Sequence, residues 1–523
     1  MNTRHRVSFY LFTFLAGLYT LLTSLRVDSG DGFTMYKVAD SLSAGKGVAI
    51  SVKPRKADSF GAWGETESLS IFEGGDGYGK WGVDGRYYAK YGLGWPLVFA
   101  PILSLAKLAP RLFPTVMEDY AGQGAMVWLN ALITSFTCVL LFRLLVQFYT
   151  PVLSVTLAIV YGLGTFAFYY ARSAFSEPFA TMLLLLALFA VSRRRFLLSG
   201  LALGGMLLVR QTTVLLALPV TFWALTSIWR ERPKVSLRRG LALLIPVALG
   251  QLGVWTYNVY RFGDWLEYGY HTVRWDTPIG LGLYSQLLSP GKGILVFAPV
   301  LITGILGWPR FWRHRSWAAL TSTLVVLWLV PHSLYVDWSG GGGWGPRLLL
   351  PIVPLFFFSA GETFARWSNH VLGRLTLVFL IVLSVLFQVL GTSVNWARHL
   401  QRVYESSSTP VQSFQRVHYN WSDSPLLGQL VSIKEEALLI HTPSSHDALH
   451  SFVTQAQASN PSTWQTVAIG LLSLNVPDYW FVYVSFLRVL PLWELLSLIA
   501  GLVGVVLWSA LRLRRALDGN LLG

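Results

Sequence analysis

The sequence predicts an all-α polytopic membrane protein, a bundle of about twelve membrane-spanning helices. The first observation is composition, because 53% of the 523 residues are hydrophobic and only 13% are charged. Soluble proteins carry about 25% charged residues, so roughly half of the usual charge is absent. The second is a series of apolar runs long enough to cross a bilayer. The third is that the basic residues gather between these runs, as in cytoplasmic loops.

A membrane span needs about twenty apolar residues. If every apolar run crossed, with the N-terminus inside, the basic clusters at 192–195, 230–239 and 512–515 would all face outside, against the usual bias. The run 92–108 is short and contains Pro96, Pro101 and Lys107, so we expect it to lie along the interface or re-enter. With that run removed from the spans, these clusters and both termini are cytoplasmic. The candidate runs are 7–25, 92–108, 123–147, 151–171, 175–192, 196–209, 211–229, 238–260, 293–309, 316–336, 347–366, 372–394 and 488–511.

This topology divides the chain into three parts. Residues 1–394 form a transmembrane module with a long first outer loop, 26–122, that holds interfacial helices. Residues 395–487 form a small extracytoplasmic segment or cap, with tracts 405–410 and 441–460 expected to be loop-rich. Residues 488–523 form the final span and a basic cytoplasmic tail. The outer face is made of four segments, 26–122, 172–178, 261–292 and 337–347. The first apolar run lacks a small-x-small cleavage pattern, so we expect an uncleaved anchor.

The net charge of +15 does not indicate nucleic-acid binding, because no separate basic domain exists. Cys138 is the one cysteine and lies in an apolar run, so the chain can form no internal disulfide and no thiolate metal site. No His, Asp and Glu cluster has convincing metal-ligand spacing. No cofactor is therefore firmly implied, and a divalent cation held through carboxylate oxygens stays optional.

Carboxylates gather on the predicted outer face. Asp28 and Asp31 follow the first span, where an ionised side chain costs little solvation energy, and glycines flank Asp31. The simpler interpretation is that Asp31 caps a helix starting near Gly32. Glu177 lies in an outer turn, where the simpler interpretation is an exposed glutamate paired with Arg172. Chemistry, if the chain performs any, is expected on this face.

Four motifs resemble the glycosyltransferase-C superfamily, the group of protein O-mannosyltransferases and lipid A aminoarabinose transferases. They are the anchor followed by Asp31-Gly32, the Tyr-Gly-Leu-Gly-Trp-Pro stretch at 91–96, the Ser-Glu-Pro turn at 176–178, and Trp338 followed by Gly-Pro-Arg at 345–347. The shared module covers roughly residues 7–260. The family motif often has Glu where this chain has Gly32, so Asp28 stays in contention with Asp31. The resemblance implies a helical membrane fold and a polyprenyl-phosphate-linked sugar donor.

For this chain, the resemblance implies an inverting glycosyltransferase of a bacterial inner or plasma membrane, active on the extracytoplasmic face. Asp31, or Asp28, would take the proton of the acceptor hydroxyl, and Glu177 would orient the acceptor. Arginine and lysine bind phosphate, although interfacial anchoring is their simpler role at helix ends. The candidates for the donor phosphate are Arg347, Arg210 and Lys292. The candidates for lining the substrates are Tyr36, Tyr91, Trp95, Trp338 and Trp344.

Two other classes of function stay open. A flippase or other transporter of lipid-linked saccharides would place ionisable residues near the membrane midplane, and here they crowd one face. A non-catalytic membrane assembly protein would use 395–487 as a binding module. The expected partners are the lipid-linked donor, membrane lipids and a lipid, glycan or protein acceptor, with no nucleic acid. The sequence identifies neither the sugar nor the acceptor.

Overall fold

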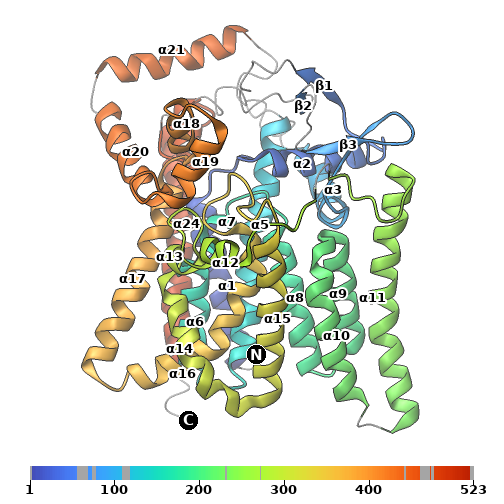
Figure 1. The fold of residues 1–523 in the computed structure, drawn as a ribbon. Helices are drawn as coiled ribbons and strands as arrows, with labels where there is room; N and C mark the ends of the chain where they lie inside the picture. Colours follow the sequence, from blue (N-terminus) through green and yellow to red (C-terminus); the bar gives the residue numbers. More distant parts are fainter. Residues whose placement is uncertain are drawn as a thin grey trace.

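The computed structural model describes residues 3–55, 69–72, 78–108, 118–229, 232–270, 273–440, 443–459, 472 and 476–518. Long helices lie side by side in a bundle, and shorter helices and four short strands gather at one end of it (Figure 1). The predicted all-α class is therefore confirmed. The bundle contains α1 (Thr3–Leu22), α5 (Glu118–Leu145), α6 (Pro151–Gly164), α8 (Glu177–Ser192), α9 (Phe196–Val209), α10 (Val214–Ile228), α11 (Pro233–Phe262), α14 (Ile302–Phe311), α15 (Arg315–Leu334), α16 (Phe356–Trp367), α17 (Val371–Ser393) and α24 (Leu492–Asp518).

Each apolar run predicted to cross forms helix in the structure. Within the described residues, seven helical stretches are long and apolar enough to cross a membrane: Tyr120–Leu145, Gln211–Ile228, Pro233–Phe262, Pro299–Leu334, Arg347–Trp367, Val371–Ser393 and Leu492–Asp518. Four shorter apolar helices accompany them: α6, α8, α9 and α3 (Gly94–Ala106). At 1.5 Å per residue, the 13 residues of α3 reach about 20 Å. This is less than a bilayer core of about 30 Å, but α6 and α9, at 14 residues each, are similarly short, so the non-crossing of 92–108 stays a prediction. The count of about twelve spans stays a prediction.

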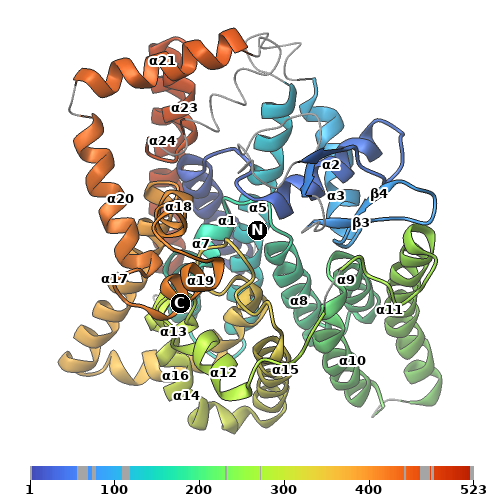
Figure 2. The same ribbon diagram turned by 45° about the horizontal axis from the view of Figure 1, so that its top comes forward.

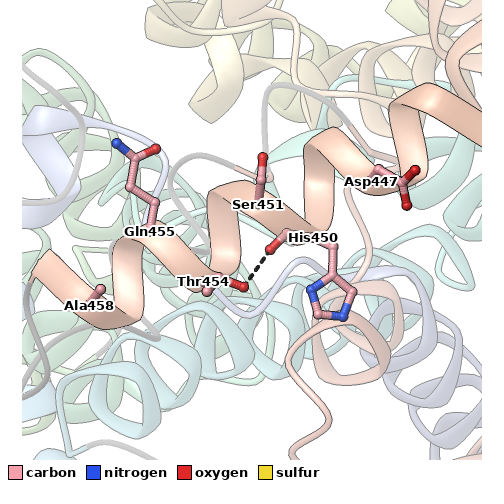
Figure 3. A pocket seen from close by; sticks show the side chains of 6 residues that line it. All are labelled: Asp447, His450, Ser451, Thr454, Gln455 and Ala458. Carbon is pink, nitrogen blue, oxygen red and sulfur yellow. Dashed lines mark hydrogen bonds between the residues drawn. The ribbon is translucent and has the colours of Figure 1, made fainter.

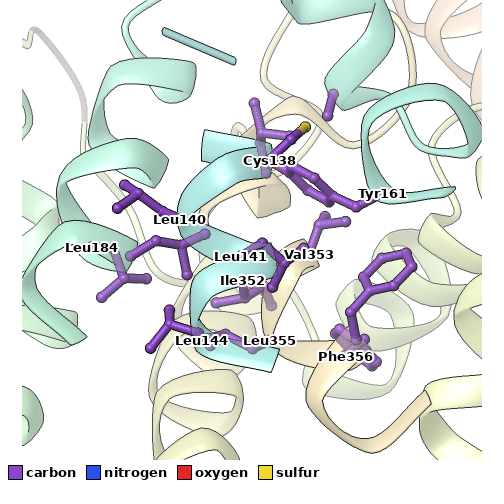
Figure 4. Packing of buried hydrophobic residues seen from close by; sticks show 14 of the residues in the cluster. Cys138, Leu140, Leu141, Leu144, Tyr161, Leu184, Ile352, Val353, Leu355 and Phe356 are labelled. Carbon is purple, nitrogen blue, oxygen red and sulfur yellow. The ribbon is translucent and has the colours of Figure 1, made fainter. Parts of the chain in front are cut away.

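The core of the bundle is apolar and lies between α5, α6, α8 and the segment that starts at Arg347. Figure 4 shows Leu141 and Leu144 of α5 packed near Ile352 and Val353. Residues Arg347–Leu355 form the 3-10 helix η4, which runs on into α16. Its prolines, at 351 and 354, have no backbone N–H, so a regular α-helical hydrogen-bond ladder cannot form there. This local geometry brings the first residue of η4 to the end of the bundle that carries the shorter elements.

That end holds two groups of short elements (Figures 1 and 2). The first outer loop contributes α2 (Gly30–Ser43), which packs on α3, with β1 (Val52–Arg55) parallel to β2 (Leu69–Phe72) and β3 (Gly79–Trp81) antiparallel to β4 (Tyr87–Ala89). The second group lies above α17 and consists of α18 (Ala397–Glu405), α19 (Pro410–Tyr419), α20 (Pro425–Ile440) and α21 (Pro443–Ser459). Smaller elements complete the chain: α7 (Ala167–Tyr170), η1 (Gln211–Thr213), α12 (Ile279–Leu287), α13 (Ile294–Phe297), η2 (Pro299–Leu301), η3 (Trp312–His314) and α23 (Trp480–Phe486).

The prediction that 441–460 is loop-rich is wrong for residues 443–459, which form α21. Pro443 stands at the first position of this helix, where its missing N–H has no cost, and alanine and glutamine favour helix beyond it. The tract 405–410 does contain the loop between α18 and α19. At the opposite end of the bundle lie the connections α14–α15 and α16–α17, both rich in arginine (Figure 1). Which end of the bundle is cytoplasmic stays a prediction.

Candidate functional site

Asp31 lies in the first turn of α2, and Ser29 is the residue that caps this helix. The Ser29 hydroxyl oxygen accepts a hydrogen bond from the Gly32 N–H at 3.1 Å. The interpretation of Asp31 as the cap is therefore wrong, because a serine two residues earlier already fills that role. A carboxylate in a first helical turn is stabilised by the positive end of the helix dipole. The Asp31 side chain is left free to point away from its own helix.

Two residues from distant parts of the chain contact the Asp31 carboxylate. The Arg347 guanidinium donates to Oδ2, with Nη1 at 2.6 Å. The Tyr91 hydroxyl donates to Oδ1 at 2.5 Å. Burial raises the pKa of Asp31, but Arg347, Lys90 and the Tyr91 hydroxyl outweigh burial and hold this pKa below its usual value. Asp31 is therefore an ionised carboxylate with both oxygens engaged.

Glu177 joins two arginines at the start of α8. Its Oε1 atom lies 2.7 Å from Nη1 of Arg210 and 3.4 Å from Nε of Arg347. The side chain is only 1% exposed, and its Oε2 atom has no hydrogen-bond partner. The interpretation of Glu177 as an exposed residue paired with Arg172 is wrong, because Arg172 pairs with Asp478 instead. Two carboxylates and two guanidiniums thus form one chain, Asp31–Arg347–Glu177–Arg210, which we call the charged cluster.

The fold positions both arginines at the charged cluster. Arg210 follows the last residue of α9 in an extended conformation, so the chain turns there before α10. Arg347 is the first residue of η4, and its guanidinium carbon lies 4.2 Å from the centre of the Phe175 ring. A Cβ atom on Gly343 would meet the Tyr170 hydroxyl at 2.4 Å, which explains the need for glycine there. The Gly-rich loop, residues 339–345, therefore passes closely over the elements that hold Arg347.

Lys292 holds the Gly-rich loop and does not contact the charged cluster. Its Nζ atom donates to the carbonyl of Gly341 at 2.9 Å and also to the carbonyl of Gly343. Burial lowers the pKa of Lys292 to about 7, and the positive charge of Arg347 contributes to the lowering. Lys292 therefore differs from Arg347 and Arg210, with which the sequence grouped it, because its hydrogen bonds go to the Gly-rich loop and not to a carboxylate.

Asp28 belongs to a second group of buried charges. Its Oδ2 accepts from the Tyr169 hydroxyl at 3.2 Å, and its Oδ1 has no hydrogen-bond partner. Nearby, Asp478 pairs with both Arg26, at 3.1 Å, and Arg172, at 2.7 Å. Burial raises the pKa of Asp28 above its usual value. The two aspartates of the first outer loop therefore differ, because only Asp31 contacts the cluster that holds Arg347 and Glu177.

The five expected lining residues are not equivalent. Tyr91 contacts the charged cluster through Asp31. Tyr36 and Trp95 have no exposed surface and pack in the apolar cluster between α2, α3 and α5. Trp344 is likewise buried and stacks on Tyr169, with ring centres 6.2 Å apart. Trp338 is 4% exposed and contacts rings of α19, so it joins the Gly-rich loop to the 395–487 segment. Packing accounts for the four buried side chains in this structure.

Several residues near the charged cluster were not singled out from the sequence. Lys90 and Asp337 act electrostatically on Asp31 and on each other. Lys90 lies over the Tyr270 ring, with Nζ 4.9 Å from its centre. Lys90 and Asp337 each directly precede a residue of the quoted motifs, Tyr91 and Trp338, so their proximity in sequence was an available signal. No comparable signal marks Tyr270, which enters from the 263–278 segment.

Within the described ranges, no group of three or more His, Cys, Asp or Glu residues could hold a metal ion. The described residues also line two surface hollows. One, of about 580 Å³, runs along α21 and includes Asp447 and His450 (Figure 3). The other, of about 560 Å³, lies between Leu93 and the outward face of α11. Neither hollow includes a residue of the charged cluster.

No protein-family model matches the sequence, and no curated protein matches it. In structure, the chain is similar to ArnT from Cupriavidus metallidurans bound to undecaprenyl phosphate. That match covers 93% of this chain and 76% of the other, with a TM-score of 0.43 and 12% identity. The chain is also similar to the apo state of ArnT from Cupriavidus metallidurans, over 93% of this chain and 75% of that one, with a TM-score of 0.41 and 12% identity.

Proposed function

We propose that this protein is an inverting membrane glycosyltransferase that moves a sugar from a polyprenyl-phosphate donor to an extracytoplasmic acceptor hydroxyl. The observation that carries the proposal is the charged cluster. It brings a carboxylate base candidate, Asp31, into direct contact with Arg347, and Glu177 links Arg347 to Arg210. The resemblance of the sequence motifs to the glycosyltransferase-C superfamily supports the same activity. The two arginines offer planar forks of donors suited to a phosphate.

In the proposed reaction, the donor phosphate takes the place of Asp31 as a partner of Arg347. Arg347 is the largest influence that lowers the pKa of Asp31, whereas burial raises it. Losing that partner would therefore make Asp31 a stronger base when the donor is bound. The acceptor oxygen attacks the anomeric carbon, and the bond from that carbon to the phosphate oxygen breaks. The hydroxyl proton passes to Asp31, and polyprenyl phosphate leaves with the electron pair. One displacement inverts the anomeric configuration.

Glu177 has a separate role in this scheme. Its contacts with both arginines hold the two guanidiniums close together although they carry like charges. Its second carboxylate oxygen is buried and has no hydrogen-bond partner. A buried carboxylate oxygen without a partner is costly, so a polar group of the acceptor would lower the free energy of the site. Glu177 is therefore proposed to orient the acceptor.

The test uses the full chain reconstituted in liposomes with a panel of undecaprenyl-phosphate-linked radiolabelled sugars and a membrane extract that supplies acceptors. The readouts are label in the acceptor fraction and release of undecaprenyl phosphate. Asp31→Asn should lower transfer by about a hundredfold or more, the range expected for loss of a general base. Asp40→Asn is the matched control, because Asp40 lies on the same helix but pairs with Lys107 outside the cluster.

Asp28→Asn decides between the two aspartates, because the proposal expects it to retain transfer. Loss of transfer in Asp28→Asn alone would move the base to Asp28. Full transfer by Asp31→Asn and Asp28→Asn, at normal protein levels, would remove the mechanism. Label that crosses sealed vesicles without any new glycosidic bond would favour a transporter of lipid-linked saccharides.

A further inference from the structure

Helix α12, in the predicted outer segment 261–292, has the reverse of the polarity expected for a helix in water. Its buried stripe consists of small or polar residues at spacings i, i+3, i+4 and i+7, namely Gly282, Ser285, Gln286 and, just beyond the helix, Ser289. The opposite stripe exposes large apolar side chains: Leu281, Tyr284 and Leu288, each 43–50% exposed. A surface helix of a soluble protein shows apolar residues inward and polar residues outward. The exposed stripe therefore indicates an apolar surrounding medium.

The buried polar side chains of α12 have partners inside the protein. The Gln286 amide donates to the Trp338 carbonyl at 3.0 Å, and the Ser285 hydroxyl lies 2.9 Å from the hydroxyl of Tyr419. The Ser289 hydroxyl donates to the carbonyl of Ser285 at 2.7 Å. These polar groups bond to the Gly-rich loop, to α19 and to the helix itself, so they do not need water. An inward polar stripe of this kind is how helices pack in a membrane.

The depth of α12 follows from its contact with α15, one of the candidate spans. Gly282 packs directly on the backbone of Ser333, where an added Cβ would meet the Ser333 carbonyl oxygen at 1.8 Å. Ser333 is in the last turn of α15, whose 20 residues reach about 30 Å, the thickness of a bilayer core. Figure 2 shows α12 toward the edge of the bundle beside α15, which it contacts. α12 therefore lies at the depth of one membrane interface.

The neighbouring helix α15 also exposes an apolar face. On that face, Val326 is 55% exposed and Val330 is 36% exposed, as expected for a span that faces lipid. Trp275 precedes α12, is 50% exposed, and lies with its ring centre 5.4 Å from that of Tyr335 at the end of α15. Tryptophan and tyrosine gather at the boundary between lipid and water. Charged residues flank Trp275 in the sequence, where Arg274 and Asp276 pair with each other at 3.5 Å.

We propose that α12 is an interfacial helix inserted in the bilayer, with Leu281, Tyr284 and Leu288 in contact with lipid acyl chains. The contact of α12 with α15, whose exposed residues are apolar and which belongs to a candidate span, identifies lipid as the occupant of this surface. The 274–276 stretch then lies at the level of the headgroups. This proposal does not depend on the enzymatic function proposed above. It adds a second interfacial helix region to the one that the sequence predicted in the first outer loop.

The test places single nitroxide spin labels on the full chain in lipid nanodiscs. Cys138 is buried, and Cys138→Ala removes it as a labelling site. The probe positions are Leu281→Cys and Leu288→Cys, which are about two helical turns apart. If one of these variants fails to fold, the other still gives the measurement. Val382→Cys, 51% exposed on the candidate span α17, is the lipid reference. Ser422→Cys, exposed between α19 and α20, is the water reference.

The measurement compares label accessibility to oxygen, which concentrates in lipid, with accessibility to a water-soluble nickel chelate. At both α12 positions we expect the ratio of oxygen to nickel accessibility to be closer to that of the Val382→Cys label. A ratio closer to that of the Ser422→Cys label would place α12 in water and overturn the proposal. Protection from both reagents would also overturn it, because a second copy of the chain or another protein would then cover the stripe.

Discussion

Glu177→Gln should destabilise the protein measurably while preserving the shape of the side chain. The substitution removes the negative charge that lies 2.7 Å from Arg210 and 3.4 Å from Arg347. A pair of unit charges about 4 Å apart interacts by roughly 4 kcal/mol at the effective dielectric constant of a protein. Arg347 keeps Asp31 as a partner, and the Arg210 side chain is 19% exposed, so water offsets part of the loss. The expected cost is about 3 kcal/mol, the lower end for breaking a buried ion pair.

The assay is thermal unfolding of the purified protein in detergent, followed by tryptophan fluorescence at a fixed scan rate. An unfolding entropy of about 2.1 cal/mol/K per residue over 523 residues converts 3 kcal/mol into a fall in Tm of about 3 °C. Glu267→Gln is the matched control, because its partner Lys80 lies 2.8 Å away with 37% of its side chain exposed. A solvated pair of this kind contributes about 1 kcal/mol or less, so Tm should fall by about 1 °C at most.

The double variant Glu177→Gln with Arg210→Gln tests the electrostatic explanation. If the cost comes from an uncompensated cation, removing Arg210 as well should restore half or more of the lost Tm. A Tm for Glu177→Gln within 0.5 °C of the wild type, on the scale of about 3 °C set above, would refute the reasoning. So would a double variant whose loss equals the sum of the two single losses, because the residues would then act independently.

Three further predictions follow from other contacts. Tyr91→Phe removes a hydroxyl that lowers the pKa of Asp31, so this pKa should rise. The transfer rate should then begin to fall at a higher pH when the solution is acidified. An unchanged pH profile would show that Tyr91 does not influence the base of the reaction. Lys292→Met removes two hydrogen bonds to the Gly-rich loop, and amide hydrogen exchange in 339–345 should become faster; unchanged exchange would show that the loop is held by other contacts. Asp478→Asn leaves two buried arginines without their carboxylate, so the free energy of unfolding should fall by about 3–5 kcal/mol. About 1 kcal/mol corresponds to one degree in Tm, so a Tm within about 1 °C of the wild type would contradict this.

The helical class could be predicted because it depends on local properties of the chain. Each predicted span forms helix, and so does the short, proline-containing run 92–108, whose interfacial position stays a prediction. Asp31, Glu177 and Arg347 could also be chosen as candidate site residues from the local sequence, because each is an ionisable residue beside an apolar run. Their roles in transfer remain proposals. The structure shows that Asp31 and Glu177 both contact Arg347, which is up to 316 positions away in the sequence.

Other features could not be predicted because they depend on distant partners. The sequence could not separate Asp28 from Asp31, since both follow the same span. The separation comes from Asp478, which holds Arg26 and Arg172 beside Asp28. The residue Asp478 does carry a weak signal, as a lone acid in the apolar and aromatic stretch before the last span. Lys292 is a similar case, because its partners are two backbone carbonyls, and no residue type reveals those.

The sequence by itself determined that this chain forms apolar helices and which residues between them carry charge. Hydropathy, helix propensity and loop charge act over a few residues, so they are readable along the chain. Only the tertiary structure decided which charges neutralise each other, which aromatic side chains are packed, and which face of α12 points outward. Ion pairs and burial depend on distances of a few ångströms between segments hundreds of residues apart, and those distances are set by the packing of the whole bundle.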